Sequence, residues 1–169
     1  MDAEQLHLTE LLFSADQLSQ LAKNPIFVKN MKDVKHIHRF LFQDIYDWAG
    51  EYRQVNINKE GKPFMSFQSF AQGDVFLNQL IETFLSSTTN IEDASVKLAK
   101  ILYSLNYMHP FREGNGRVER EVLRCLALSQ GFILRLNPAD KKQVYDEYMQ
   151  GTIQGDLQIL KNVIEKTWC

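Results

Sequence analysis

The sequence predicts an all-α domain with one short β-hairpin, and three observations support this prediction. Apolar residues recur at three- and four-residue spacing along most of the chain. One short segment, residues 52–67, alternates with a period of two instead. Asn, Pro and Gly stand at positions where helices begin and end. The 169 residues suit one hydrophobic core, so we expect a single domain over residues 1–169.

Residues 33–48 form the first predicted helix. Its apolar stripe consists of Val34, Ile37, Leu41, Ile45 and Trp48. Phe40 and Phe42 widen the stripe, so we expect this helix to be buried on most of its sides. Gly50 follows as the predicted stop.

The period-two segment, residues 52–67, is predicted to form a hairpin. Its turn falls at residues 59–62, where Lys-Glu-Gly-Lys separates the alternating run that begins at Tyr52 from the shorter run that ends at Phe67. An irregular surface loop is the alternative structure for this segment.

The remaining helices are predicted from their stripes and caps. One covers residues 70–84, and the next is capped by Asn90 and ends before Pro110. A third covers residues 116–131, with its final glycine as the cap. The Asn-Pro-Ala-Asp run at 137–140 predicts another helix start, and two short helices close the chain.

Composition excludes several classes of protein. The formal net charge of −2 gives no global attraction to nucleic acid or anionic lipid, and no stretch is long enough to span a bilayer. We therefore expect neither nucleic acid nor a membrane as a partner. Two cysteines are too few for a disulfide framework, and Cys125 is expected to be a buried free thiol. The acidic N-terminus lacks a signal-peptide pattern, which favours the cytoplasm.

The candidate functional residues lie where one helix ends and another begins, in the run His109-Pro110-Phe111-Arg112-Glu113-Gly114-Asn115-Gly116-Arg117. Glycines at 114 and 116 permit positive φ and close approach of the backbone to a ligand. The new helix adds unpaired N–H groups and a partial positive charge. Arg117, Arg120 and Arg124 share one helix face. Together these features predict a site for a phosphate chain.

Glu113 and His109 add chemistry to this site. A carboxylate beside phosphates requires a bridging cation, and Mg²⁺ is the usual one. His109 is the natural general base for an attacking hydroxyl, although its place at a helix C-terminus favours the protonated form. Each feature also has a structural explanation when taken alone: a helix cap, a glycine turn, and arginines on a solvated face paired with Glu119 and Glu121. Their combination at this spacing favours a functional site.

The run from His109 to Arg120 resembles the Fic motif, His-Pro-Phe-x-Asp/Glu-Gly-Asn-Gly-Arg-x-x-Arg, with every position filled. The stretch from Ile37 to Arg53, which ends in Trp-Ala-Gly-Glu-Tyr-Arg, also resembles the upstream helix of that family. The similarity covers about residues 33–135, the expected core of a Fic-type helical domain.

The resemblance implies a role for each motif residue. His109 is the general base, with Asn115 also counted as catalytic, Phe111 anchors the loop in the core, and Glu113 holds Mg²⁺. The ATP phosphates are bound by Gly114, Asn115, Gly116, Arg117 and Arg120. The family's flap, a hairpin that docks the target protein, corresponds to Asn58, Lys59, Glu60, Gly61, Lys62, Pro63, Phe64 and Met65.

The expected function is that of a protein adenylyltransferase, which transfers AMP from MgATP to a Ser, Thr or Tyr hydroxyl of a target protein. Three alternatives remain. Kinases of the Doc branch bind the nucleotide in reverse but have a degenerate glycine loop, other relatives transfer UMP or phosphocholine, and a non-catalytic binding module would not need His109 and Glu113. The resemblance is to bacterial toxins and effectors, so delivery to a host cell stands beside a cytoplasmic location.

The resemblance also bears on control of the enzyme. Many Fic proteins carry an inhibitory helix, Ser/Thr-x-x-x-Glu-Gly/Asn, whose glutamate pairs with the second motif arginine, here Arg120. Only Glu60 and Glu113 precede Gly or Asn, and Asn56 and His109 stand four residues before them. We therefore expect a protein that is active alone or is restrained by a separate small antitoxin that supplies a glutamate to Arg120. A divergent inhibitory helix within the chain is the alternative.

Overall fold

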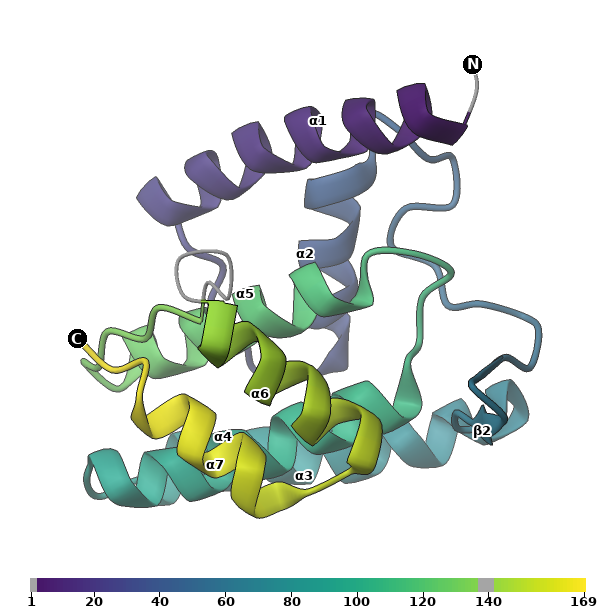
Figure 1. Cartoon of the computed structure of the whole chain (residues 1–169). Coiled ribbons are helices and arrows are strands. Elements are labelled where there is room, and N and C mark those ends of the chain that lie inside the picture. The colour runs from purple at the N-terminus through teal and green to yellow at the C-terminus, as the bar shows by residue number, and fades with distance from the viewer. Residues whose placement is uncertain (1–2, 137–141) are drawn as a thin grey trace.

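The computed structural model describes residues 3–136 and 142–169, which form seven α-helices, a short 3₁₀ helix and a two-stranded hairpin (Figure 1). In chain order the elements are α1 (Ala3–Lys23), α2 (Met31–Phe42), β1 (Asn58–Lys59), β2 (Lys62–Pro63), η1 (Phe67–Ser69), α3 (Phe70–Ser87), α4 (Ile91–Met108), α5 (Asn115–Ser129), α6 (Lys142–Gln154) and α7 (Leu157–Glu165). The predicted all-α fold with one hairpin is confirmed. The helix start predicted at 137–140 lies outside the described residues.

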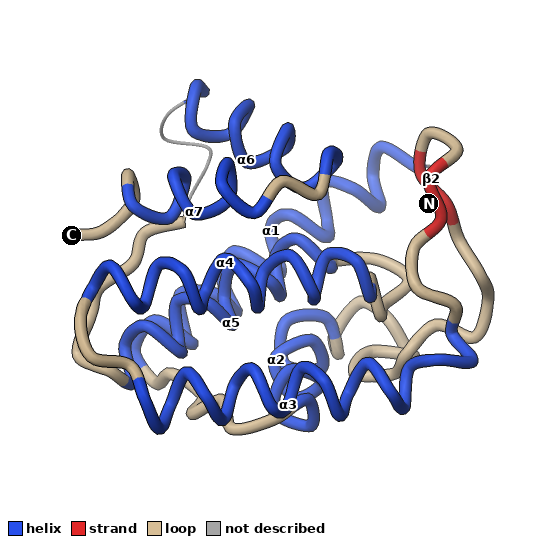
Figure 2. Tube along the Cα trace, turned by 90° about the horizontal axis from the view of Figure 1, so that it is seen from below, coloured by secondary structure: helices blue, strands red, loops and turns tan. Residues whose placement is uncertain are grey.

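The core is built around α4, which contacts α3, α5 and α7. Seen from below, α3 and α4 lie side by side, with α6 and α7 along the opposite side of α4 (Figure 2). Leu98, Leu102 and Leu105 of α4 are buried in this core. As predicted, the Asn90 side chain caps α4 by accepting from the backbone of Asp93, and Cys125 is a buried free thiol.

Helix α2 is shorter than the predicted helix over residues 33–48, so that prediction is wrong beyond Phe42. The chain after Phe42 folds back on its own helix instead. The Gly50 N–H donates to Nδ1 of His38 at 2.8 Å, and the Tyr46 ring stacks on Trp48. These tertiary contacts outweigh the local preference for helix that the spacing of Ile45 and Trp48 indicates.

The hairpin over residues 52–67 is confirmed at its tip and wrong at its ends. Only β1 and β2 pair, with Asn58 opposite Pro63 and Lys59 opposite Lys62. The two turn residues between them, Glu60 and Gly61, both have positive φ, as a tight two-residue hairpin turn requires. The flanking segments are loops, shaped by the buried side chain of Arg53.

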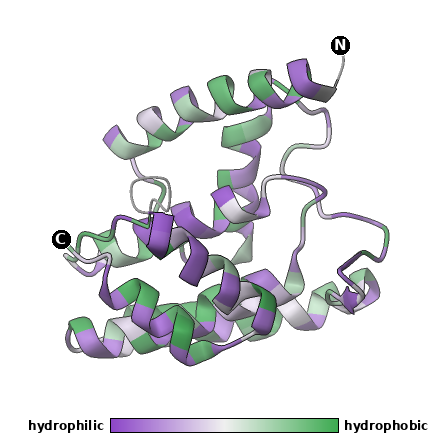
Figure 3. Cartoon of the chain, viewed as in Figure 1, coloured by the Kyte–Doolittle hydropathy of each residue, from purple (hydrophilic) through white to green (hydrophobic). Residues whose placement is uncertain are grey.

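The buried face of α1 mixes apolar and polar side chains, with Leu21 in the core near its C-terminal end, so it does not form a continuous apolar stripe. Glu10 and Ser14 are buried against the rest of the protein, whereas Leu8, Leu12 and Phe13 are exposed. Figure 3 shows that hydrophobic and hydrophilic segments alternate along α1. Across the described ranges, 3–136 and 142–169, no helix has the length and apolarity needed to cross a bilayer.

Candidate active site

His109 stands at the C-terminal end of α4, in a strained backbone conformation. Its φ of 43° and ψ of 60° are left-handed, which is uncommon for a residue other than glycine and concentrates at functional sites. The following Pro110 disfavours continuation of the helix. The Arg53 Nε donates to the His109 carbonyl at 2.8 Å and so fixes this conformation.

Arg53 ties the base of the hairpin to the end of α4. Its side chain is buried at 1% exposure, and its guanidinium donates to the carbonyls of Val55, Met65 and Met108 as well as His109. A buried charge is tolerated only when its donors are satisfied, and four carbonyl acceptors do this here. In the sequence Arg53 ends the run Trp-Ala-Gly-Glu-Tyr-Arg, but this structural role was not predicted from it.

The His109 imidazole is neutral at physiological pH. Burial, with smaller contributions from the positive charges of Arg53 and Lys59, lowers its pKa from 6.5 to about 4, and the Asn106 carbonyl opposes this shift. These effects outweigh the helix C-terminus, which was expected to favour protonation. The ring stacks on Phe64 of the hairpin, with 4.0 Å between ring centroids. Nδ1 is buried, so Nε2 is the nitrogen available to a substrate in the neighbouring cavity.

His38 of α2 contacts the turn between α4 and α5 and helps to hold its conformation. Phe111 is buried as predicted, and its ring stacks on His38 at 3.9 Å. His38 Nδ1 accepts from the Gly50 N–H, so Nε2 carries the proton and donates to the Glu113 carbonyl at 3.1 Å. Burial lowers the pKa of His38 to about 4, which keeps it neutral in this bridging role.

Gly114 and Asn115 shape the turn through contacts within the protein. Gly114 has a φ of 79°, and a Cβ there would lie 2.4 Å from the Phe42 ring. The Asn115 side chain both accepts from and donates to the backbone of Phe111. Its amide therefore holds the loop, whereas the first backbone N–H groups of α5 have no acceptors within the helix.

The three arginines of α5 have different partners. Arg117 forms an ion pair with Glu10 of α1 and donates to the Ser14 hydroxyl at 2.9 Å. Arg124 pairs with Glu121, as the structural alternative expected. Within the described ranges Arg120 has no ion pair, and its guanidinium lies 5.9 Å from the centre of the Tyr148 ring. Arg120 is therefore the one of these three arginines without an ion pair in the described part of the chain.

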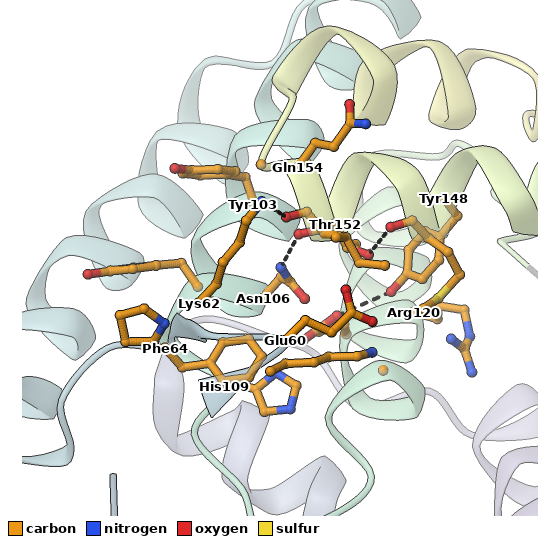
Figure 4. Close-up of a pocket in the computed structure, with 18 of the residues that line it drawn as sticks. Glu60, Lys62, Phe64, Tyr103, Asn106, His109, Arg120, Tyr148, Thr152 and Gln154 are labelled. Carbon is orange, nitrogen blue, oxygen red and sulfur yellow. Dashed lines mark hydrogen bonds between the residues drawn. The ribbon is translucent and has the colours of Figure 1, made fainter. Parts of the chain in front are cut away.

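A cavity of about 410 Å³ lies between the hairpin, α4, α5 and α6 (Figure 4). Of the predicted site residues it is lined by Lys59, Glu60, Lys62, Pro63, Phe64, His109, Gly116 and Arg120. Asn58, Gly61, Met65, Glu113, Gly114, Asn115 and Arg117 are not among its lining residues. Hydrogen bonds join its walls: Lys62 donates to the Ile153 carbonyl, Asn106 of α4 to the Thr152 carbonyl of α6, and the Tyr148 hydroxyl of α6 to Glu119 of α5.

The far wall of the cavity was missed at the sequence level. It consists of Tyr103 from α4 with Tyr145, Tyr148 and Met149 from α6. The α6 residues recur at three- and four-residue spacing, which in a sequence is the pattern of a core stripe. No local signal distinguishes an apolar wall that faces a ligand from one that faces another helix.

Glu113 is the candidate metal ligand, and its carboxylate is exposed beside the turn. Among residues 3–136 and 142–169, no group of three or more His, Cys, Asp or Glu could hold a metal by itself. A single carboxylate that needs phosphate oxygens and water to complete the coordination fits Mg²⁺, which binds with few protein ligands and retains water.

Comparison with known proteins agrees with this geometry. A family model described as the Fic/DOC family matches residues 29–127. The probable protein adenylyltransferase Fic of Escherichia coli is 31% identical over 142 residues, which cover 82% of this chain and 70% of that protein.

Two solved structures share the fold. The N-terminal Fic domain of a Bartonella effector protein from Bartonella sp. AR 15-3 has a TM-score of 0.87 and 19% identity, over 99% of this chain and 84% of that one. BepC from Bartonella tribocorum, with bound AMPPNP, has a TM-score of 0.83 and 18% identity, over 99% and 88% of the two chains. Because the matched family region spans more than half of the sequence and includes the whole turn from His109 to Arg120, the chain belongs to the Fic/DOC family.

Proposed function

We propose that this chain is a protein adenylyltransferase, which transfers AMP from ATP to a hydroxyl group of a target protein. The observation that carries the proposal is a buried, neutral His109 in the wall of a cavity that also contains Gly116, Arg120 and the tip of the hairpin. The name of the E. coli relative, a probable protein adenylyltransferase, supports it.

In the proposed reaction, His109 acts as the general base for the target hydroxyl. Nε2 of His109 takes the proton of the target Ser, Thr or Tyr hydroxyl, and the hydroxyl oxygen attacks the α-phosphorus of ATP. The new P–O bond forms as the bond to the bridging oxygen of the β-phosphate breaks, and pyrophosphate leaves. A histidine with a pKa of about 4 is ready to accept a proton at pH 7 but is a weak base, so positioning by Arg53 and Phe64 contributes much of the rate.

The proposed binding place of the nucleotide is the cavity. The N–H groups at the start of α5 and the Arg120 guanidinium stabilise the phosphates. The apolar wall formed by Tyr103, Tyr148 and Phe64 suits the flat adenine ring. Glu113 would hold Mg²⁺, which when bound neutralises phosphate charge. Arg117 would add to this binding after it leaves Glu10.

The tip of the hairpin is the proposed docking element for the target. Its strands are only two residues each and exposed, which would allow their outer edge to pair with an extended segment of a target protein. A separate antitoxin that supplies a glutamate to Arg120 remains part of the proposal, since Arg120 has no ion pair among the described residues.

The alternatives predict different products, so one assay separates them. The purified chain is incubated with MgATP labelled on the α- or the γ-phosphate, and self-modification is measured by intact mass and label. Added AMP with α-label supports adenylyl transfer, whereas added phosphate with γ-label would identify a kinase. Parallel reactions with UTP and with CDP-choline test the two other groups, and a chain that binds ATP without any modification would be a binding module.

A further inference from the structure

Glu119 is a buried carboxyl group in the cavity wall that the proposed reaction does not use. It lies on α5 one helical turn after Gly116, with 3% of its surface exposed. Oε2 accepts from the Tyr148 hydroxyl at 3.2 Å. Oε1 is buried and has no hydrogen-bond partner in the described part of the chain. Buried polar atoms without partners are rare in proteins, so Oε1 is a candidate hydrogen-bonding group for a bound ligand.

Burial of Glu119 outweighs the neighbouring groups that stabilise its ionised form. Burial raises its pKa to about 7, against the Tyr148 hydrogen bond and the Arg120 charge, which lower it. Tyr148 itself stays protonated, because burial raises its pKa further. The other titratable groups of the cavity are Lys59, Glu60 and Lys62 from the hairpin, Tyr103, Tyr107 and His109 from the α4 side, and Tyr145 from α6. The carboxyl is therefore the group in this wall poised to change charge near neutral pH.

Binding of a nucleotide changes which protonation state of Glu119 is favoured. Its phosphates bring several negative charges to Gly116 and Arg120, and Arg120 is adjacent to Glu119. An ionised carboxylate would repel them in this buried setting. A neutral acid removes that repulsion and adds one O–H donor.

We propose that Glu119 is a nucleotide-binding residue: it enters the complex as the neutral acid, donates a hydrogen bond from Oε1 to the ligand, and so couples binding of a nucleoside triphosphate to uptake of one proton. This inference rests on the proposed function in one respect, since it takes the nucleotide to bind in this cavity.

The coupling has a size that can be measured. A group with a pKa of about 7 in the free protein, protonated in the complex, weakens apparent binding about tenfold between pH 6 and pH 8. At pH 7 about half a proton is taken up for each ligand bound. Glu119→Gln replaces the neutral acid with a group of the same shape that cannot titrate, and its carbonyl still accepts from Tyr148.

The test is calorimetric titration of the full chain with AMPPNP in excess Mg²⁺, at pH 6, 7 and 8, in two buffers of different ionisation enthalpy. The wild-type chain should show the tenfold change and the proton uptake. Glu119→Gln should bind with nearly constant affinity, about tenfold more tightly than wild type at pH 8. Glu121→Gln, which removes a buried carboxylate of the same helix outside the cavity, should keep the wild-type pH dependence.

Two results would overturn the proposal: equal pH dependence in wild type and Glu119→Gln, or loss of binding in Glu119→Gln at every pH while the variant remains folded. Thermal melting supplies a second readout. Because the folded-state pKa is raised, the stabilising contribution of Glu119 is lost as pH rises through about 7, so Glu119→Gln should melt above wild type at pH 8 and close to it at pH 5. Absence of AMPPNP binding to the wild-type chain would refute the proposed function itself.

Discussion

Glu10 of α1 forms an ion pair with Arg117 of α5, although 107 positions separate the two residues in the sequence. The Tyr46 hydroxyl donates to the same carboxylate at 3.1 Å, and Ser14 accepts from Arg117. The pair is mostly buried and fastens α1 to the start of α5. The glutamate reaches the first motif arginine, not Arg120, so it differs from the inhibitory pairing sought in the sequence.

The first prediction follows from this pair. Glu10→Gln should strengthen binding of MgATP roughly threefold to tenfold, about 1 kcal/mol, because the Arg117 charge is then free for phosphate. Calorimetry with AMPPNP measures the change. Asp146→Asn, which breaks an exposed pair with Lys142, should have no effect. Weaker binding by Glu10→Gln would mean that Glu10 orients Arg117 for the ligand and does not compete with it.

The second prediction concerns Gly114. Gly114→Ala should destabilise the protein by more than about 2 kcal/mol, since it adds both backbone strain and a clash with Phe42. Gly131→Ala is the matched control, because Gly131 has the same φ of +79° and no atom within 4 Å of an added Cβ. It should cost only about 1 kcal/mol. Urea denaturation compares them, and equal losses would show that the Phe42 contact is unimportant.

The third prediction concerns pH. The lowered pKa of His109 means that the base is neutral from pH 8 down to about pH 5 and is lost by protonation near pH 4. The pH profile of kcat/KM should therefore have its acid limb near 4, well below the 6.5 of an exposed histidine. Returning acid-treated samples to pH 7 controls for unfolding. An acid limb at 6.5 would contradict the buried state of the ring.

The fourth prediction concerns the hairpin. Asn58→Pro keeps the inward bond from the Phe64 N–H to the Ile57 carbonyl but removes the Asn58 N–H, which points to the outer edge because Asn58 stands opposite Pro63. Modification of a target protein should fall at least about tenfold, while self-modification and ATP binding change less. The three activities are measured on the same preparation. Equal loss of all three would make the hairpin a structural element only.

The fold was predictable where local signals agree with tertiary packing. The stripe and the Asn90 cap of α4, and the glycine at the end of α5, each lie where the sequence indicated. The prediction failed at residues 43–48, where the bond from Gly50 to His38 turns the chain back. The sequence did not predict α1, whose buried face combines Leu21 with the polar side chains of Glu10 and Ser14.

For the candidate site, too, the sequence indicated the local features but not the contacts between distant segments. The motif from His109 to Arg120 is contiguous, so its spacing alone indicated a phosphate site. The positions of Arg53, Glu10 and Glu119 depend on contacts between segments distant in sequence, which periodicity does not encode. Asn115 illustrates the limit of a motif: the residue was identified, but its side chain bonds the Phe111 backbone.

The most direct test of the account uses His109→Ala with ATP labelled on the α-phosphate. The account predicts that transfer of labelled AMP falls by about 10²- to 10⁴-fold, the range for loss of a general base. It also predicts that AMPPNP still binds with near wild-type affinity, because Arg120 and the start of α5 are unchanged. Undiminished transfer, or loss of transfer only in proportion to lost nucleotide binding, would contradict the assignment of His109 as the base.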